Sequence, residues 1–166
     1  TITGVTSGTN PSQYDWFTDQ YHVFDRNDAI GILNQPYGFF PVNTGLEEDP
    51  FYFAVHWRGS IVAPADGSYT VTAKSDDDFW VIVNGEEKIN LGGVHALSGT
   101  TTSLELNAGT STIDLYFAER HRGQSGIVFT VDGVSFSPCV EQSTPENLPP
   151  YFVNFHPATI ATSTDL

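Results

Sequence analysis

Three consecutive aspartates, Asp76, Asp77 and Asp78, are the residues whose type and spacing most directly suggest chemistry. They precede residues 79–83, a run that is apolar on both faces and is therefore typical of a central strand. Carboxylates at the start of such a strand lie near the low-dielectric interior, so their charge must be compensated by backbone N–H groups or by a cation. Calcium would satisfy the cluster, because it takes about 6–8 oxygen ligands in irregular geometry.

The geometry of the aspartate pair limits how it could hold one ion. Neighbouring side chains in a strand point to opposite faces, so Asp76 and Asp77 cannot both reach an ion from ordinary extended backbone. A distorted or cis peptide between them would bring both carboxylates to one side. We expect Asp78 to be a bystander that caps the turn. The simpler alternative for all three is a solvated turn that starts a strand.

The elements that must position these residues are predicted to be β-strands. Turn signals at residues 64–67, 84–85, 108–109 and 132–133 separate short apolar or alternating runs. Strands therefore recur about every 8–12 residues, as in a sandwich or barrel. Residues 30–50 are predicted to be a long loop with short strands, and residues 14–28 could hold one helical turn. The expected fold is an all-β, antiparallel β-sandwich or barrel with long loops and little helix.

Composition excludes several classes of partner. The chain has 166 residues and a formal charge of −14, which argues against nucleic acids and acidic membranes and favours binding of cations. No apolar run approaches the roughly 18 residues of a membrane span. The chain contains no Met, so we expect a segment of a longer protein whose export, if any, is directed from elsewhere. The single cysteine, Cys139, is either a small buried hydrophobe or a reactive thiol.

Four motifs resemble those of one family. The segment SDDDFWVIVNGE resembles the S-D-D-x-x-x-L-x-V-x-G signature of the β-sandwich module named after anthrax protective antigen, which occurs in yeast flocculins and adhesins, bacterial toxins and some glycosidases. Upstream, HWRGSIVAPADGSYTV is similar to that family's W-x-G-x-I-x-A-P-x-x-G-x-Y segment. INLGGVHALSG and LYFAERHRGQSGIVF resemble its bacterial fibro-slime subgroup. The resemblance covers about residues 50–136.

The resemblance implies a calcium-dependent lectin site. In the lectin members, two consecutive aspartates joined by a cis peptide chelate calcium, a second loop adds an amide and backbone carbonyls, and vicinal sugar hydroxyls complete the shell. Asp76 and Asp77 match the acidic pair. In the second loop, Gln124 matches the amide, although the family lectins usually carry Asn there, and Gly126 is expected to supply a carbonyl. Asp76, Asp77 and Gln124 would then also bind the sugar.

Two further residues are expected to approach the sugar, and the others considered are expected to be structural. Arg122 lies in the second loop, and His95 lies in a fibro-slime motif. Each has the alternative of a solvated or structural role. The remaining candidates are assigned to the core or to structural polar contacts: Trp57, Trp80, Glu119, Arg120, His56 and His121.

The whole sequence is therefore expected to be one lectin-like domain over residues 1–166, with its recognisable core at about 50–136. Residues 137–166 are expected to wrap the domain or to link it to a next module, and 151–166 could pair with residues 1–8 as a last strand. The expected function is calcium-dependent binding of cell-surface hexose or deoxyhexose glycans by a non-catalytic module of an extracellular adhesin, next to other domains of the same long chain. The alternative is a structural or protein-binding spacer. The preferred sugar is not determined by the sequence.

Overall fold

Two antiparallel sheets form the domain. The computed structural model describes residues 17, 33–40, 51, 53–137 and, for the backbone alone, 157–162. One sheet has the order β1-β8-β3-β6, with β1 at Leu33–Gln35, β8 at Gly126–Val131, β3 at Gly67–Asp76 and β6 at Ser98–Leu106. Almost every described residue outside the turns belongs to a strand, so the prediction of an all-β fold is confirmed.

The second sheet has the order β10-β2-β7-β4-β5, and β9 also pairs with β2. Its strands are β2 (Phe53–Ala63), β4 (Asp78–Val83), β5 (Glu86–Leu91), β7 (Gly109–Glu119), β9 (Ser135–Ser137) and β10 (Pro157–Thr162). Strand β4 lies between β7 and β5, which explains why it is apolar on both faces.

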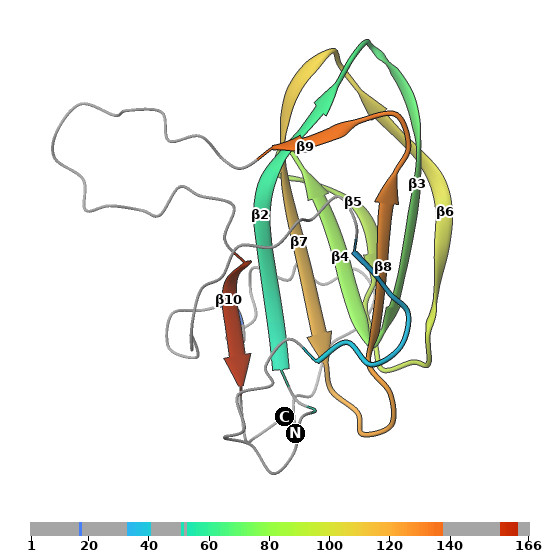
Figure 1. Cartoon of the computed structure of the whole chain (residues 1–166), viewed down its shortest axis with the longest axis vertical. Coiled ribbons are helices and arrows are strands. Elements are labelled where there is room, and N and C mark those ends of the chain that lie inside the picture. The colour runs from blue at the N-terminus through green and yellow to red at the C-terminus, as the bar shows by residue number, and fades with distance from the viewer. Residues whose placement is uncertain (1–16, 18–32, 41–50, 52, 138–156, 163–166) are drawn as a thin grey trace, which may run out of the picture.

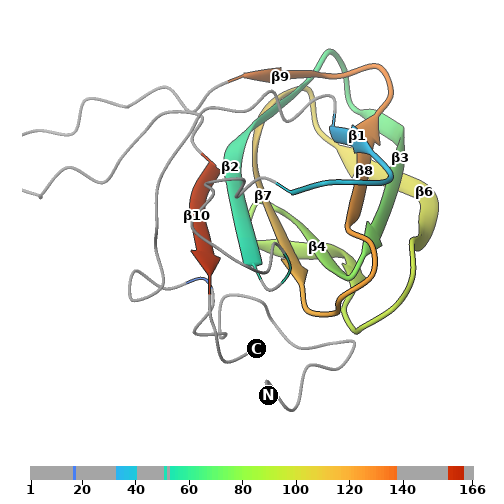
Figure 2. The same cartoon turned by 60° about the horizontal axis from the view of Figure 1, so that its bottom comes forward.

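The hydrophobic core lies between the sheets. Figure 2 shows β8, β3 and β6 facing β2, β7 and β4 across the sandwich. Alternate residues of each strand point inward, as the pleat requires. The largest fully buried side chains include Phe53, Trp57, Phe79, Phe117 and Phe129. Both Trp57 and Trp80 are fully buried, as expected for core residues.

The predicted turns occur where the sequence signals place them. Asn84 and Gly85 connect β4 to β5 with positive φ angles of 51° and 77°, the backbone that an Asn-Gly hairpin favours. Gly109 at the β6–β7 connection and Gly133 at the β8–β9 connection also have positive φ. These hairpins fix the strand registers and so determine which residues meet at each end of the sandwich.

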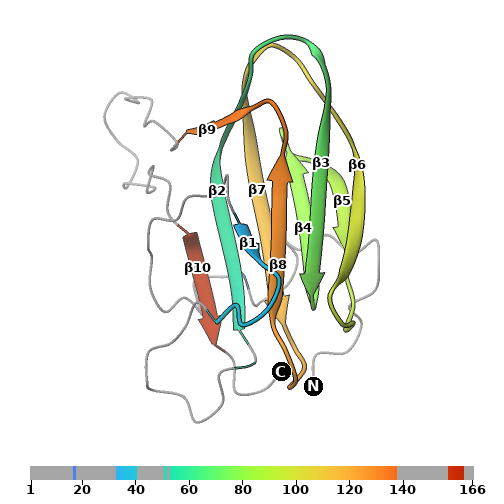
Figure 3. The same ribbon diagram turned by 45° about the vertical axis from the view of Figure 1, so that its right-hand side comes forward.

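The sandwich has two ends with different chemistry. At the lower end in Figure 1, β3 and β7 finish while β4 and β8 begin, so the three aspartates and residues 119–126 lie together there. Figure 3 shows the same end, with β3 and β7 running toward it and β8 leading away from it. The turns at residues 64–67, 84–85 and 107–109 lie at the opposite end.

Several sequence-based expectations concern segments that lie partly or wholly outside the described residues. Residues 33–40 contain β1 followed by a bend, in accord with a loop that carries short strands. Strand β10 pairs with β2, and residues 1–8, its other predicted partner, lie outside the described residues. Cys139 and the helical turn at 14–28, apart from Phe17, also lie outside them. Among the described residues, no helix has the length and apolar character needed to cross a membrane.

Candidate metal and ligand site

The peptide bond between Asp76 and Asp77 is cis, as the sequence analysis expected. Asp76 ends β3 and Asp77 connects it to β4, so the pair carries the chain from one sheet of the sandwich to the other. Asp76 is partly exposed, whereas Asp77 is 1% exposed. The pair therefore presents one carboxylate toward solvent and one toward the interior.

Backbone amides from two loops hold the Asp77 carboxylate. The N–H of His95, in the β5–β6 connection, donates to Oδ1 at 2.8 Å, and the N–H of Arg120, just after β7, donates to Oδ2 at 2.9 Å. Both oxygens are therefore fixed in position by backbone donors from separate elements. Each carboxylate oxygen retains lone-pair capacity for another ligand.

Glu119 is the third carboxylate of the site. One oxygen from each of Asp76, Asp77 and Glu119 lies within 4.8 Å of the others. Two oxygens that each lie about 2.4 Å from a calcium ion can be no more than about 4.8 Å apart, so the three carboxylates could share one ion. From the sequence, Glu119 was expected to have only a structural ion-pair or hydrogen-bond role.

Unpartnered buried oxygens surround this cluster. Glu119 is fully buried, and its Oε1 accepts the N–H of His121 at 2.9 Å, but its Oε2 has no hydrogen-bond partner among the described residues. The buried hydroxyls of Ser75 and Ser125 are likewise unpartnered among those residues. Buried polar atoms are normally satisfied, so these oxygens have unused capacity for a hydrogen-bond donor or a cation.

Two carboxyl groups of the cluster have raised pKa values. Burial and the neighbouring negative charge of Asp77 raise the pKa of Glu119 to about 9, although the amide of His121 opposes the shift. Burial and the charge of Asp77 also raise the pKa of Asp76. Without a cation, Asp76 and Glu119 thus favour protonation, because burial and nearby like charges disfavour their ionised forms. A divalent ion would supply that compensation.

Asp78 is a buried ion-pair residue, which corrects the prediction that it is a bystander capping the turn. It is fully buried, and Arg120 Nε and Nη2 donate to its two oxygens at 2.6 and 3.1 Å. Its Oδ1 also accepts the N–H of Gly93. Asp78 lies opposite Ala118 in the β4–β7 register, which brings Arg120, two residues later, within reach. The ion pair joins the start of β4 to both loops that hold Asp77.

The structure brings Gly126 to the acidic pair and leaves the role of Gln124 as a prediction. Gly126 begins β8 directly opposite Asp76 in the register. Gln124 lies two residues earlier in the β7–β8 loop and is exposed. Only glycine fits at position 126, since a Cβ there would lie 2.3 Å from the carbonyl oxygen of Pro36. The register therefore places Gly126 beside Asp76, and the ligand roles of Gly126 and Gln124 stay predictions.

His95 and Arg122, the other predicted sugar contacts, differ in how the structure places them. Arg122 is exposed in the β7–β8 loop. The ring nitrogens of His95 lie 3.0 Å from the Leu91 carbonyl oxygen and 3.2 Å from the Ser98 hydroxyl, so the ring is held within its own loop. The observed contribution of His95 to the site is its backbone amide. A contact between its side chain and a sugar remains a prediction.

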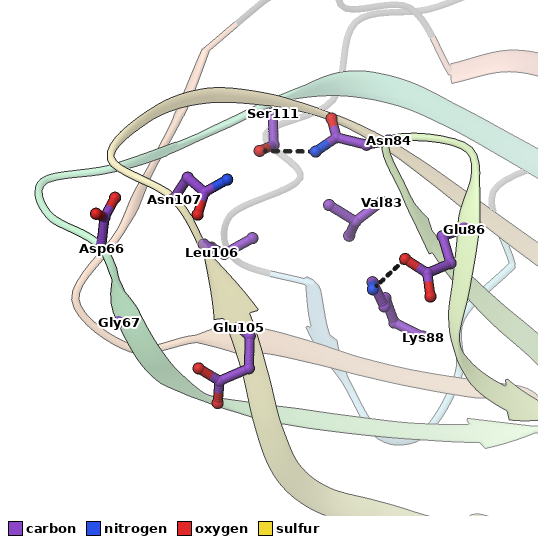
Figure 4. A pocket seen from close by; sticks show the side chains of 10 residues that line it. All are labelled: Asp66, Gly67, Val83, Asn84, Glu86, Lys88, Glu105, Leu106, Asn107 and Ser111. Carbon is purple, nitrogen blue, oxygen red and sulfur yellow. Dashed lines mark hydrogen bonds and ion pairs between the residues drawn. The ribbon is translucent and has the colours of Figure 1, made fainter.

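The opposite end of the sandwich holds a separate polar hollow of about 390 Å³ (Figure 4). Lys88 Nζ lies 2.6 Å from Glu86 Oε2 there, and Asn84 donates to the Ser111 hydroxyl at 3.1 Å. Glu105 lines the same hollow. Its carboxylates are exposed and belong to hairpin ends, unlike the buried cluster around Asp77. This end provides control positions for experiments on the acidic cluster.

The fold and the site together define a β-sandwich domain with buried carboxylates at one end. These carboxylates belong to the β3–β4 connection, to β4 and to β7. More specifically, the chain belongs to the PA14 domain family, which matches residues 13–131. The family named after protective antigen is therefore confirmed. The fibro-slime subgroup remains a prediction.

Relatives are found in Dictyostelium discoideum. The chain is 31% identical to Protein psiE over 128 residues, which is 73% of this chain and 26% of that protein. It is 34% identical to Protein psiB over 118 residues, which is 61% of this chain and 21% of that protein. The chain thus spans about a quarter or less of the length of these relatives.

Two solved structures show a distant similarity at low sequence identity. A GH31 alpha-xylosidase from Xanthomonas citri matches with a TM-score of 0.47 and 11% identity, over 86% of this chain and 16% of that chain. A family 35 carbohydrate binding module from an environmental isolate matches with a TM-score of 0.38 and 16% identity, over 76% of this chain and 100% of that chain.

Proposed function

We propose that this domain is a calcium-dependent carbohydrate-binding module of a larger extracellular or cell-surface protein, and that it binds vicinal hydroxyls of hexose or deoxyhexose glycans in cell adhesion. The observation that carries the proposal is the cluster of Asp76, Asp77 and Glu119, whose oxygens lie within 4.8 Å of one another. The unpartnered Oε2 of Glu119 supports a cation in that cluster.

The ligand count leaves room for a sugar. Three carboxylates, the Gln124 amide and the Gly126 carbonyl would supply about five oxygens if each gave one, whereas calcium takes about 6–8. Asp76 is partly exposed, so solvent reaches the site from that side. A vicinal diol can replace two waters with one rigid unit, which loses less entropy than two separate ligands would. Selection would then depend on the geometry of the diol.

Binding fits the cluster better than catalysis. Glycosidases use two carboxyl groups about 5–9.5 Å apart in different protonation states. Carboxylates that share one calcium ion all stay ionised, so none of them would be available as the proton donor. A single sugar held through two hydroxyls would bind weakly, and several copies of the domain would supply avidity.

A glycan array tests the proposal directly. The domain should bind a subset of hexose- or deoxyhexose-terminated glycans in millimolar calcium, and EDTA should abolish that binding. Binding that persists in EDTA would contradict the calcium bridge. Absence of binding in both conditions would favour the alternative, a structural or protein-binding spacer in which protein oxygens close the metal shell.

A further inference from the structure

The exposed large hydrophobic side chains of the described residues gather at the metal end of the sandwich. They are Tyr37, which is 70% exposed, and Val94, which is 52% exposed. Val94 precedes His95, whose amide holds Asp77. Tyr37 follows β1, which pairs with β8 where the second loop ends. An apolar surface thus lies on either side of the acidic cluster.

The bend that carries Tyr37 is anchored to the second loop. Phe39 is 3% exposed and packs against Phe53, Trp57 and Phe117, with ring centroids 5.3–6.1 Å apart. Its N–H donates to the Ser125 carbonyl at 3.0 Å. Tyr37 is therefore held out in solvent by a fixed backbone, so an interaction with a ligand would cost little ordering of the chain.

The strand order gives the spacing between Tyr37 and the aspartate pair. Strands β1, β8 and β3 are neighbours, and at their shared end Tyr37 follows β1, Gly126 begins β8 and Asp76 ends β3. Neighbouring strands lie about 4.8 Å apart, so β1 and β3 are separated by about 10 Å across β8. Tyr37 lies two residues beyond β1 at this end, so a sugar ring held by an ion at Asp76 would lie on the same side of the sandwich as the tyrosine.

We propose that Tyr37 is a specificity-determining residue of the site, whose ring packs against the apolar face of a sugar held at Asp76 and Asp77. The inference rests on the proposed function. The preferred ligand would carry two features at once: a vicinal diol for the ion and a neighbouring C–H or methyl face for the ring. The negatively charged face of an aromatic ring favours polarised C–H groups.

The test uses D-galactose, D-glucose, D-mannose and L-fucose as probes, titrated in saturating calcium, and follows the sugar that wild type binds most tightly. Tyr37→Ala should weaken its binding by about tenfold, whereas Tyr37→Phe, which keeps the ring, should remain within about twofold of wild type. Calcium affinity measured without sugar should be the same in all three proteins.

The outcomes separate this inference from the proposed function. If Tyr37→Ala binds the sugar as tightly as wild type, Tyr37 has no role in recognition, although the calcium-dependent lectin would stand. If Tyr37→Ala also loses calcium affinity, the residue supports the metal site and the stacking role is wrong. If wild type binds none of the four sugars or the array glycans, both the proposed function and this inference fail.

Discussion

Asp78 and Arg120 form a buried two-pronged ion pair, with Nε to Oδ2 at 2.6 Å and Nη2 to Oδ1 at 3.1 Å. The same Arg120 donates its backbone N–H to Asp77, and Asp78 accepts the N–H of Gly93 in the loop that also holds Asp77. Asp78 thus contacts both of the loops whose backbone amides donate to the Asp77 carboxylate. Asp78 therefore positions the acidic site without belonging to it.

Breaking this pair should destabilise the domain strongly. Arg120→Met leaves Asp78 fully buried without its cation, and loss of one partner of a buried pair costs about 3–5 kcal/mol. Urea denaturation in EDTA would measure the change in unfolding free energy. The double variant Asp78→Leu with Arg120→Met should lose less than the sum of the two single variants, because neither charge is then left unpaired.

An exposed pair offers the matched control. Arg58 Nε lies 3.1 Å from Asp114 Oδ1, but the Arg58 side chain is 61% exposed. Arg58→Met should therefore cost less than about 1 kcal/mol, as solvent screens the pair. Equal losses for Arg58→Met and Arg120→Met would contradict the positioning role assigned to the buried pair.

Removing one acidic ligand should weaken calcium binding. Asp77→Asn keeps the shape of the side chain and removes the charge, so we expect calcium affinity to fall by at least about tenfold in a calorimetric titration. Glu105→Gln removes a carboxylate at the opposite end of the sandwich and should leave calcium affinity unchanged. If both variants bind calcium like wild type, the ion is held elsewhere.

Glu119→Gln should separate metal binding from stability. Gln has nearly the same shape and can still accept the N–H of His121 through its carbonyl, while its amide can donate toward Asp77. The calcium-free variant should therefore be at least as stable as wild type, and its calcium affinity should fall by about tenfold. Unchanged calcium affinity would show that Glu119 contributes no ligand oxygen.

A histidine outside the acidic site should make stability depend on pH. Burial lowers the pKa of His56 from its usual 6.5, although the hydrogen bond that His56 donates to Asp114 opposes the shift. The unfolded chain therefore takes up this proton first, so the contribution of His56 to stability should fall as pH drops below about 6.5. Burial disfavours the ionised form of Asp114, but the contacts with His56 and Arg58 outweigh that effect and lower the pKa of Asp114. The contribution of Asp114 to stability is therefore lost only at more acidic pH, below about 3.8.

The pH effect of His56 can be isolated with one variant. His56→Gln cannot titrate but can still donate a hydrogen bond to Asp114, whose Oδ1 lies 2.8 Å from His56 Nε2. Chemical denaturation should show that acidification from pH 7.5 to pH 5.5 changes the unfolding free energy less favourably in wild type than in His56→Gln, because the raised pKa of Glu119 acts equally in both proteins. The same change in both proteins would show that His56 does not contribute to the pH dependence.

Local sequence signals predicted the strands and turns, because hairpins depend on few neighbouring residues. Asn84-Gly85 fixed one turn through its preference for positive φ. The two adjacent aspartates required a distorted or cis peptide to share an ion, and the family resemblance implied the cis form that is observed. Glu119 was missed as a site residue because 42 residues separate it from Asp77 and only sheet pairing brings them together. The signal was present: period two places Glu119 on the inward face with Leu115 and Phe117.

The role of Asp78 was missed for a related reason. Alternation places Asp78 on the same face as Trp80, which was expected to be a core residue, but Asp78 itself was expected only to cap the turn. In the fold, Gly92 lies against Trp80, and Gly93 and Arg120 cover Asp78, so the outer face is buried as well. Which loop covers a strand end depends on tertiary packing, and no local pattern in the sequence encodes it.

The central claim, that a sugar completes the shell of a calcium ion at Asp76 and Asp77, is tested most directly by measuring calcium affinity with and without the sugar. Binding to a shared ion requires reciprocal coupling: if calcium strengthens sugar binding, the sugar must strengthen calcium binding by the same factor. Calorimetric titration of calcium into the domain should give a lower Kd in saturating sugar than in buffer. A calcium Kd that is the same in both would contradict the bridge.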